Sequence, residues 1–552
     1  MVIEFGKIAL FAAVGGALVG SVSTLALRKG SMTTRLRRCQ GLAWLSAVAA
    51  AVCVVVVVLH GSYGVALSVP GSKHSFQLLS ADPTTVVLLL LICGVGAVVE
   101  SFSLRYLQGD ERAPVFFGWT GLVLFAMSMV VTASTVVVVT VAWVVVGWSF
   151  PRVVGYRNGA SAIAKSVRVL RRNFIVGDAA LVLAVVLIVE RVGNIQLAAG
   201  LTLAHDSRLL GSWSTIVALL IVIAALVRSA QLVFSLWLPT TVAAPTPVSA
   251  LLHAGVVNGG GILLIRFGPL ASSSEAAMLV AFVSGTATAL VAFVVMRSRA
   301  DIKGSLVYST MSQMGFMIAE CSVGLPFAAL LHLVGHGIYK ATLFFRSGTA
   351  VPRLGAKTVV AKVYAPKWGV VVQAALATAL LSGLVLLVVS ILGQHEPGVL
   401  LVFVVGSFGV ATWNWFNRRP IPIIFTVMWL VALGLVGTLY ALVLAALQGW
   451  TATSLPGASI EVLGPWWLLV LAVLGVALTA AFARRNARRW LVYRLGAIGD
   501  WAVRDLVDVP YEPQTAGDGV GLGQRDSPPI FRGKGALVYE RGSSKAERGS
   551  GQ

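Results

Sequence analysis

Charged residues are scarce in this sequence. Asp, Glu, Lys and Arg make up 11% of its 552 residues, whereas 57% are hydrophobic and the mean hydropathy is +0.89. Soluble domains are about one quarter charged. The composition therefore excludes an ordinary soluble protein and predicts an integral membrane protein.

Acidic residues are scarcer than basic ones, with 21 Asp and Glu against 42 Lys and Arg and a net charge of +21. Such a charge would suit a nucleic-acid-binding protein. The basic residues, however, lie in short clusters between long apolar runs, so we expect no nucleic-acid partner.

The sequence also lacks the patterns of cofactor and metal sites. Its four cysteines have neither metal-ligand spacing nor a paired arrangement, and we interpret them as small apolar residues; they are Cys39, Cys53, Cys93 and Cys321. No Walker motif, GxGxxG element or Ser-His pattern is present. We therefore expect no cofactor or metal on this chain, and a transporter subunit instead of an enzyme.

Long apolar runs dominate what remains. A helix of roughly 17–25 apolar residues crosses about 30 Å of hydrocarbon, and fifteen runs fit this description. They lie at 5–27, 41–59, 84–104, 115–132, 134–151, 174–190, 213–237, 248–267, 274–296, 306–321, 326–346, 368–391, 399–416, 421–446 and 466–483. The predicted fold is all-α, a polytopic membrane domain over residues 1–489.

Lys and Arg gather in alternate loops between these spans, and the other loops hold only Lys73, Arg191 and Arg208. The positive-inside rule places the basic loops and the C-terminus in the cytoplasm and the N-terminus outside. Residues 490–508 have the apolar side of an amphipathic interfacial helix. Residues 509–552 are rich in Gly, Pro, Ser and charge, which predicts a disordered cytoplasmic tail.

A few ionisable residues fall inside the apolar runs. Such groups are costly near the bilayer centre and usually face an ion path or a bundle interior; they are Glu100, Asp178, Arg228, His253, Glu320, His332, His336 and Lys340. For each, a hydrogen bond between helices or a side chain reaching a helix end is the alternative role.

The spacing of His332, His336 and Lys340 places them on one face of a helix. Two imidazoles beside an ammonium group suit a proton relay. A metal site is the weaker interpretation, because no nearby Glu or Cys completes it.

The segment "WLPTTVAAPTPVSALLHAGVVNGGGILLIRFG" (237–268) contains a helix break. Pro239, Pro245 and Pro247 cannot continue a helix, so we expect the chain to restart near Val248. Transporters place ion sites at such breaks, where the backbone lines a cavity inside the protein.

Polar and small residues surround the expected break. Arg228 lies just before it, and Ser249 and His253 lie one turn apart just after it. The glycines at 259–261 would allow another helix to approach closely.

These segments resemble a known superfamily. "RSAQ…WLP…APTPVSALLHA" (228–254), "ADIKGSLVYSTMSQMGFM" (300–317), "LLHLVGHGIYKATLFFRSG" (330–348) and "FSLRYLQGDERAPVFF" (102–117) are similar to signatures of the antiporter-like membrane subunits of respiratory complex I and Mrp cation/proton antiporters. The resemblance is strong over about 80–350 and implies broken helices and inverted repeats.

Within that superfamily, "HAGVVNGGGILLIRF" (253–267) most resembles the DabB family. DabB is the membrane subunit of a two-component, energy-coupled inorganic carbon pump. The resemblance implies a bacterial plasma-membrane location and a large cytoplasmic-side partner, DabA, with a zinc site like that of β-carbonic anhydrases. It further implies that this subunit passes protons or Na⁺ while the partner handles CO2 or bicarbonate.

The sequence departs from the superfamily at two charged positions. The glutamate of the family's Trp-Glu-Leu-Val-Gly motif is absent from residues 143–147, and Arg228 stands where the family has a lysine. A guanidinium does not release its proton, because its pKa exceeds about 12. Arg228 would therefore be a fixed positive charge, and the proton path would be lined by His253, His332, His336 and Lys340.

Two other functions remain open from the sequence. One is an Mrp-like or complex I-like antiporter subunit that exports Na⁺ or H⁺. The other is a membrane anchor that conducts nothing and positions a partner.

Overall fold

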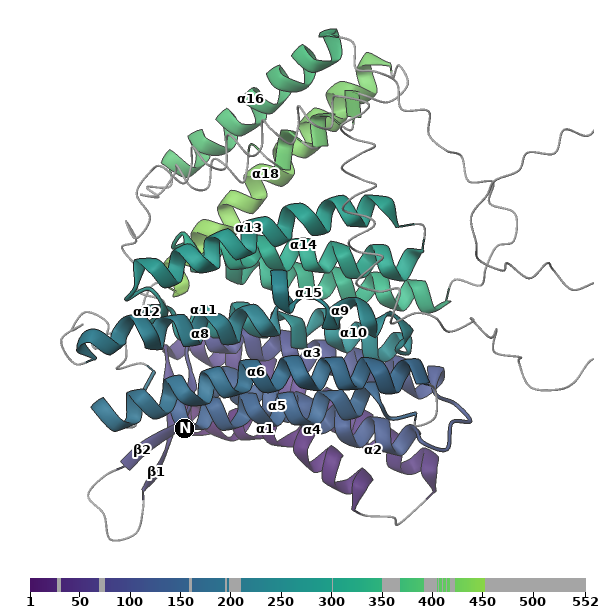
Figure 1. Cartoon of the computed structure of the whole chain (residues 1–552), viewed down its shortest axis with the longest axis vertical. Helices are drawn as coiled ribbons and strands as arrows, with labels where there is room; N and C mark the ends of the chain where they lie inside the picture. Colours follow the sequence, from purple (N-terminus) through teal and green to yellow (C-terminus); the bar gives the residue numbers. More distant parts are fainter. Residues whose placement is uncertain are drawn as a thin grey trace, which may run out of the picture. The chain divides into compact units, whose positions relative to one another are not determined.

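The computed structural model describes residues 1–26, 31–68, 75–157, 161–193, 196–197, 210–299, 301–349, 368–391 and 422–451, with short pieces of 405–416. Helices account for most of this chain (Figure 1). Eleven of the described helices or helix pairs are long and apolar enough to cross a membrane. The chain is therefore a multi-pass membrane protein, as the composition predicts.

The first part of the bundle consists of long helices joined by short connections. They are α1 (Val2–Leu25), α2 (Met32–His60), α3 (Pro83–Tyr106), α4 (Ala113–Thr132), α5 (Val136–Val154) and α6 (Ser161–Val192). Neighbours in sequence are mostly neighbours in space: α1 packs on α2 and α4, α2 packs on α3, and α5 packs on α4 and α6.

The second part contains shorter pieces and then further long helices. The short pieces are η1 (Gly211–Trp213), α8 (Ser214–Arg228), η2 (Leu232–Phe234), α9 (Trp237–Thr240), η3 (Thr241–Ala243), α10 (Thr246–Ala254), η4 (Val256–Asn258), α11 (Gly259–Arg266) and α12 (Gly268–Ala271). The long helices are α13 (Glu275–Ser298), α14 (Ile302–Ser322), α15 (Pro326–Thr349), α16 (Trp368–Ile391) and α18 (Ile423–Thr451).

Polar residues begin several of these helices. The side chains of Ser31, Thr135, Ser274 and Asp301 each accept a backbone N–H of the first turn, and Asp82 forms a capping box with Thr85 at the start of α3. Because the first N–H groups of a helix have no partner inside it, these caps stabilise each start.

The structure contains a hairpin that the all-α prediction missed. Strand β1 (Tyr63–Ser68) pairs antiparallel with β2 (Ser75–Ala81), with Tyr63 opposite Ala81 and an irregularity at Val65/Ala66. The two strands lie between α2 and α3, where hydropathy shows only a connection between spans.

Two of the fifteen predicted spans differ in the structure. The span 213–237 is not one helix, because α8 ends at Arg228, and the span 248–267 is divided into α10 and α11 by the turn at η4. Only pieces of 399–416 are described, and 466–483, 490–508 and 509–552 lie outside the described residues. The count of fifteen therefore stays a prediction.

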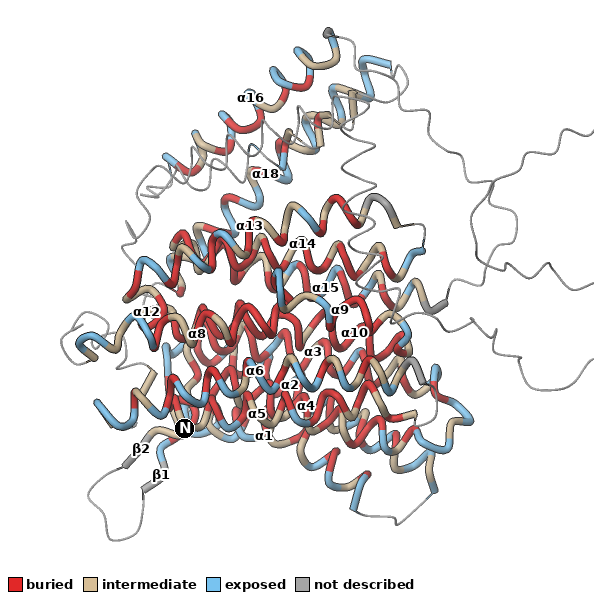
Figure 2. Tube along the Cα trace, in the orientation of Figure 1, coloured by how far each residue is buried: buried red, intermediate tan, exposed pale blue. Residues whose placement is uncertain are grey.

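Burial is greatest along α10 and α11 (Figure 2), where 94% of the spanning window is enclosed by other helices. The corresponding shares are 33% for α16 and 22% for α18. The broken segment is thus the most enclosed span of the described chain, as expected for irregular backbone at membrane depth.

The three glycines at the start of α11 allow this enclosure. A Cβ on Gly259 would lie 2.9 Å from Arg228 Cγ, and one on Gly261 would lie 2.4 Å from the Cε methyl of Met317. A Cβ on Gly260 would lie 2.2 Å from the carbonyl oxygen of Ala225 on α8. Two of these contacts involve α8 and the third α14, so each glycine supports helix packing.

We predict that Gly260→Ala separates α8 from α11, because the added methyl group meets a backbone carbonyl that cannot rotate away. Overpacking of this kind costs about 1–3 kcal/mol. Thermal unfolding in detergent should show a lower midpoint for this variant. Gly94→Ala on α3 is the matched control, since a Cβ there meets no atom within 4 Å. Equal midpoints for the two variants would contradict the packing.

Candidate functional site

The helix break starts directly after Arg228. Ala230 and Leu232 have φ angles of +54° and +38°, a left-handed conformation that costs a non-glycine residue free energy. The carbonyls that the end of α8 leaves open accept hydrogen bonds from nearby residues. Trp237 Nε1 donates to the Val227 carbonyl oxygen at 3.0 Å, and the backbone N–H of Gln231 donates to the Leu226 carbonyl oxygen at 2.9 Å.

The remainder of the break is also tied to neighbouring helices. Lys303 Nζ on α14 donates to the Ala244 carbonyl at 3.2 Å, and the Leu232 amide donates to Thr288 Oγ1 on α13 at 2.9 Å. Unpaired backbone groups are costly in hydrocarbon, so these side chains stabilise the irregular conformation.

The three prolines lie at the far end of this break. Pro239 is inside the four-residue α9, Pro245 is the N-cap of α10, and Pro247 is in the first turn of α10. Non-helical backbone therefore begins at Ser229, earlier than the prolines indicate. Proline is well suited to the first turn of a helix because its missing N–H has no intrahelical partner there.

Arg228 is buried and paired with a carboxylate. It is 2% exposed, and its Nη2 lies 2.6 Å from Asp178 Oδ1 on α6. Its guanidinium carbon lies 4.2 Å from the ring centroid of Trp143 and 4.3 Å from that of Phe174. Two aromatic rings and one carboxylate thus compensate a charge that hydrocarbon would not tolerate.

Asp178 supplies the acid that residues 143–147 lack. Its Oδ2 occupies the space beside Gly147 on α5, where a Cβ would lie only 2.1 Å away. The glycine lets α6 bring its carboxylate against the segment of α5 that corresponds to the superfamily's motif, at the motif's glycine and one turn away from the position of its glutamate. From the sequence, Asp178 is one of several ionisable residues inside the apolar runs and a possible accessory residue of the ion path, whereas in the structure it is the direct partner of Arg228.

His253 lies in the last turn of α10 and is fully buried. Its imidazole stacks on the Phe344 ring of α15 with centroids 4.3 Å apart and an interplanar angle of 6°. Neither ring nitrogen has a hydrogen-bond partner in the structure. A buried polar group without a partner is costly, and the stacking on Phe344 does not satisfy these nitrogens.

The three residues predicted to form a relay lie on α15, where His336 and Lys340 are buried and His332 is partly exposed. Lys340 Nζ donates to Ser309 Oγ of α14 at 2.7 Å, and His332 Nδ1 lies 2.9 Å from Glu320 Oε2 of the same helix. The rings of His332 and His336 have centroids 6.2 Å apart. Both nitrogens of His336 are buried without a partner, as in His253.

His253 lies against the same helix, because α10 packs on α15 and Phe344, on which His253 stacks, follows Lys340 by one turn. His253, the three α15 residues and Glu320 thus form one group, a row that spans α10, α15 and α14. Arg228 and Asp178 form a second group. The turn η4 links the two groups, since Ser229 Oγ donates to the Val257 carbonyl at 3.0 Å.

Two of the residues named from the sequence lie outside both groups. Glu100 is buried on α3, which packs on α2. Ser249 donates to the Pro245 carbonyl of its own helix at 3.5 Å, which is a local structural contact. No cluster of three His, Cys, Asp or Glu suited to a metal ion occurs in the part of the chain that the structure describes.

Three residues that contact the candidate site were not predicted from the sequence, and they are Phe344, Ser309 and Lys303. Phe344 and Ser309 resemble ordinary helix residues, and only their contacts reveal them. Lys303 had a signal, because it is a cation inside the segment "ADIKGSLVYSTMSQMGFM" that resembles the superfamily.

We predict that Asp178→Asn and Arg228→Met each lower the unfolding midpoint in detergent by a large amount. Removing one member of a buried ion pair costs about 3–5 kcal/mol, because the other charge stays buried and uncompensated. The double variant should recover most of the loss. Glu4→Gln is the control, since Glu4 is exposed and its 2.7 Å pair with Lys7 contributes little. Additive effects in the double variant would argue against direct coupling.

Two family models match this chain. Residues 133–364 match the membrane domain of NADH:quinone oxidoreductase/Mrp antiporters, and residues 71–117 match the N-terminal part of NADH-ubiquinone oxidoreductase (complex I) chain 5. Together they span about half of the chain and contain every residue of the two groups described above.

Curated relatives match over a similar region. The chain is 33% identical over 277 residues to the "probable inorganic carbon transporter subunit DabB1" of Halothiobacillus neapolitanus, covering 50% of each chain. It is 29% identical over 273 residues to the DabB subunit of Bacillus anthracis, covering 50% of this chain and 53% of that one. NADH-quinone oxidoreductase subunit L of Mycobacterium tuberculosis is 31% identical over 282 residues, with 50% and 43% covered. The matches thus span about half the length of these relatives.

Solved structures share the fold over most of the chain. The Mrp complex from Dietzia sp. superposes with a TM-score of 0.56 at 21% identity, covering 94% of this chain and 64% of that one. The archaeal membrane-bound sulfane sulfur reductase gives 0.55 at 17% identity, with 90% and 99% covered. With its curated DabB relatives and both family models, residues 71–117 and 133–364 of this chain form an antiporter-like membrane domain of the complex I and Mrp type.

Proposed function

We propose that this protein is the membrane subunit of an energy-coupled inorganic carbon transporter and that it passes protons through the membrane. The names of the DabB relatives support the substrate class. The main support for the ion path is the row of ionisable side chains from His253 through α15 to Glu320.

Each member of the row has a role that follows from its chemistry. His253 and His336 exchange protons with water at the break, because their buried nitrogens have no protein partner. Lys340 and the His332–Glu320 pair continue the path toward α14. Arg228 keeps its proton and acts as a fixed positive charge, and Asp178 holds the guanidinium in place.

The coupling step is mechanical in this proposal. Protonation of His253 changes the charge at the end of α10. This helix is not continuous with another α-helix on either side, because η3 precedes it and η4 follows it. A cytoplasmic DabA-like partner with its own zinc site senses the resulting shift of α10 and retains CO2 or bicarbonate in the cytoplasm. The protein would lie in the bacterial plasma membrane with its N-terminus outside and its C-terminus in the cytoplasm, and the basic loops support this orientation.

A cation/proton antiporter subunit is the second candidate. The match to the Mrp and complex I family model favours it, and Na⁺ is then an alternative coupling ion. Gene neighbourhood separates the two, because a large zinc-site gene beside this one supports the carbon pump. Six or seven consecutive genes for small membrane proteins beside this one would support an Mrp system. Activity that resists protonophores would favour the non-conducting anchor.

We predict that His253→Ala and His336→Ala each reduce energised bicarbonate uptake to background, because each removes a proton carrier from the row. The assay is uptake of labelled bicarbonate in cells that lack their own pump and express this chain with its partner. His60→Ala is the matched control, since His60 is exposed at the end of α2. Protonophore-sensitive uptake that survives both buried substitutions would exclude the relay.

Arg228→Lys and Arg228→Gln separate charge from geometry at the break. We expect the lysine variant to retain most of the uptake, because an ammonium group can pair with Asp178. The glutamine variant should lose uptake, because Asp178 is left without a cation. If both variants retained bicarbonate uptake equally well in the same assay, the positive charge would be dispensable.

A further inference from the structure

A basic cavity lies at the ends of α5 and α6, away from the row of histidines. It has a volume of about 880 Å³ and opens where α5 ends and where α4 and α6 begin. Five arginines line it, and they are Arg112, Arg152, Arg157, Arg168 and Arg171. No acidic side chain contributes to this lining.

Arg157 has its counter-ion at the edge of the cavity. Asp110 lies in an adjoining pocket, with its Oδ2 2.8 Å from Arg157 Nη2. Burial alone would raise the pKa of Asp110, but hydrogen bonds from the Arg112 amide and the Arg157 side chain hold it below its ordinary value. Asp110 therefore stays charged and compensates Arg157. Within the cavity, Arg152 and Arg171 repel each other, so a bound anion would relieve the repulsion.

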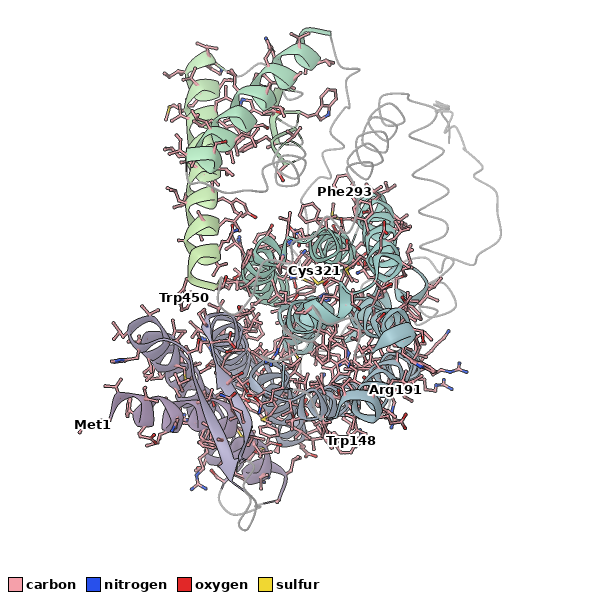
Figure 3. All side chains as sticks on the ribbon, turned by 90° about the vertical axis from the view of Figure 1, so that its left-hand side faces the viewer. Met1, Trp148, Arg191, Phe293, Cys321 and Trp450 are labelled. Carbon is pink, nitrogen blue, oxygen red and sulfur yellow. The ribbon has the colours of Figure 1, made fainter. Side chains whose placement is uncertain are left out.

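Beside Arg152 the cavity borders tryptophans and exposed apolar side chains, which form its apolar wall. The guanidinium carbon of Arg152 lies 3.7 Å from the ring centroid of Trp148 and 5.1 Å from that of Trp119. Trp148 is 49% exposed and lies at the edge of the helix bundle (Figure 3). Val115, which also lines the cavity, is 37% exposed. Tryptophan next to exposed apolar side chains and cations is typical of the membrane interface.

We propose that this cavity binds the phosphate headgroup of an anionic phospholipid. The arginines bind the phosphate oxygens, since guanidinium forms paired hydrogen bonds with phosphate. The acyl chains lie along Trp119, Trp148 and Val115. Basic pockets between membrane helices bind such headgroups in other proteins, and the apolar wall distinguishes a lipid from free phosphate.

The probes are phosphatidylglycerol and phosphatidylcholine with identical acyl chains, added to the purified protein in detergent, with retained lipid counted by native mass spectrometry. We expect retention of phosphatidylglycerol and not of phosphatidylcholine. Arg168→Gln/Arg171→Gln should weaken this retention about tenfold or more, because each cation near an anionic headgroup contributes measurably. Millimolar inorganic phosphate should leave it unchanged.

Arg37→Gln/Arg38→Gln is the matched control, because it removes the same charge from two exposed residues at the start of α2. Retention should then change less than twofold. Arg168→Lys/Arg171→Lys keeps the charge and should keep most of the binding, which separates loss of the site from loss of the fold.

Three results would overturn the proposal. In the first, both glutamine double variants retain phosphatidylglycerol equally. In the second, inorganic phosphate displaces the lipid, which would make the cavity a site for small anions. In the third, the Arg168/Arg171 variants retain the lipid and instead lose binding of a co-expressed protein subunit, which would make the cavity a protein-docking surface.

Discussion

The guanidinium of Arg228 has to be neutralised inside the membrane, and much of the surrounding structure follows from this requirement. Its carboxylate comes from α6, its aromatic cover from Trp143 and Phe174, and its close approach to α11 from Gly259. Because α8 ends at the same residue, the charge also lies next to the carbonyls that the broken helix leaves open. One buried cation thus determines how α5, α6, α8 and α11 meet.

The same constraint applies to the backbone between Ser229 and Pro245. In hydrocarbon, peptide groups without partners are costly, and here two of them are paired by side chains of other helices, Lys303 and Thr288. These contacts fasten the break to α13 and α14. The irregular segment is therefore an integral part of the fold, consistent with its high burial.

Hydropathy predicted the long helices well, because each needs only length and apolar composition. Hydropathy placed the end of the span that contains α8 at residue 237, whereas α8 ends at Arg228. A window of apolar residues does not distinguish α8 from the non-helical residues that follow it. Hydropathy also missed the hairpin between α2 and α3. The residues of the α15 relay could be named because their spacing defines a helix face, whereas the pairing of Asp178 with Arg228 depends on how α5 and α6 cross at Gly147.

The position of α10 explains why a single imidazole can matter to the whole segment. This helix has nine residues and is bounded by the break on one side and η4 on the other. His253 lies in its last turn, stacked on α15, and η4 follows at once and contacts Ser229. A short helix between two breaks can shift without bending a continuous helix, so its position is set by the helices that enclose it. In the proposed mechanism a charge on His253 therefore acts on α10, and through η4 on the end of α8 where Arg228 is held.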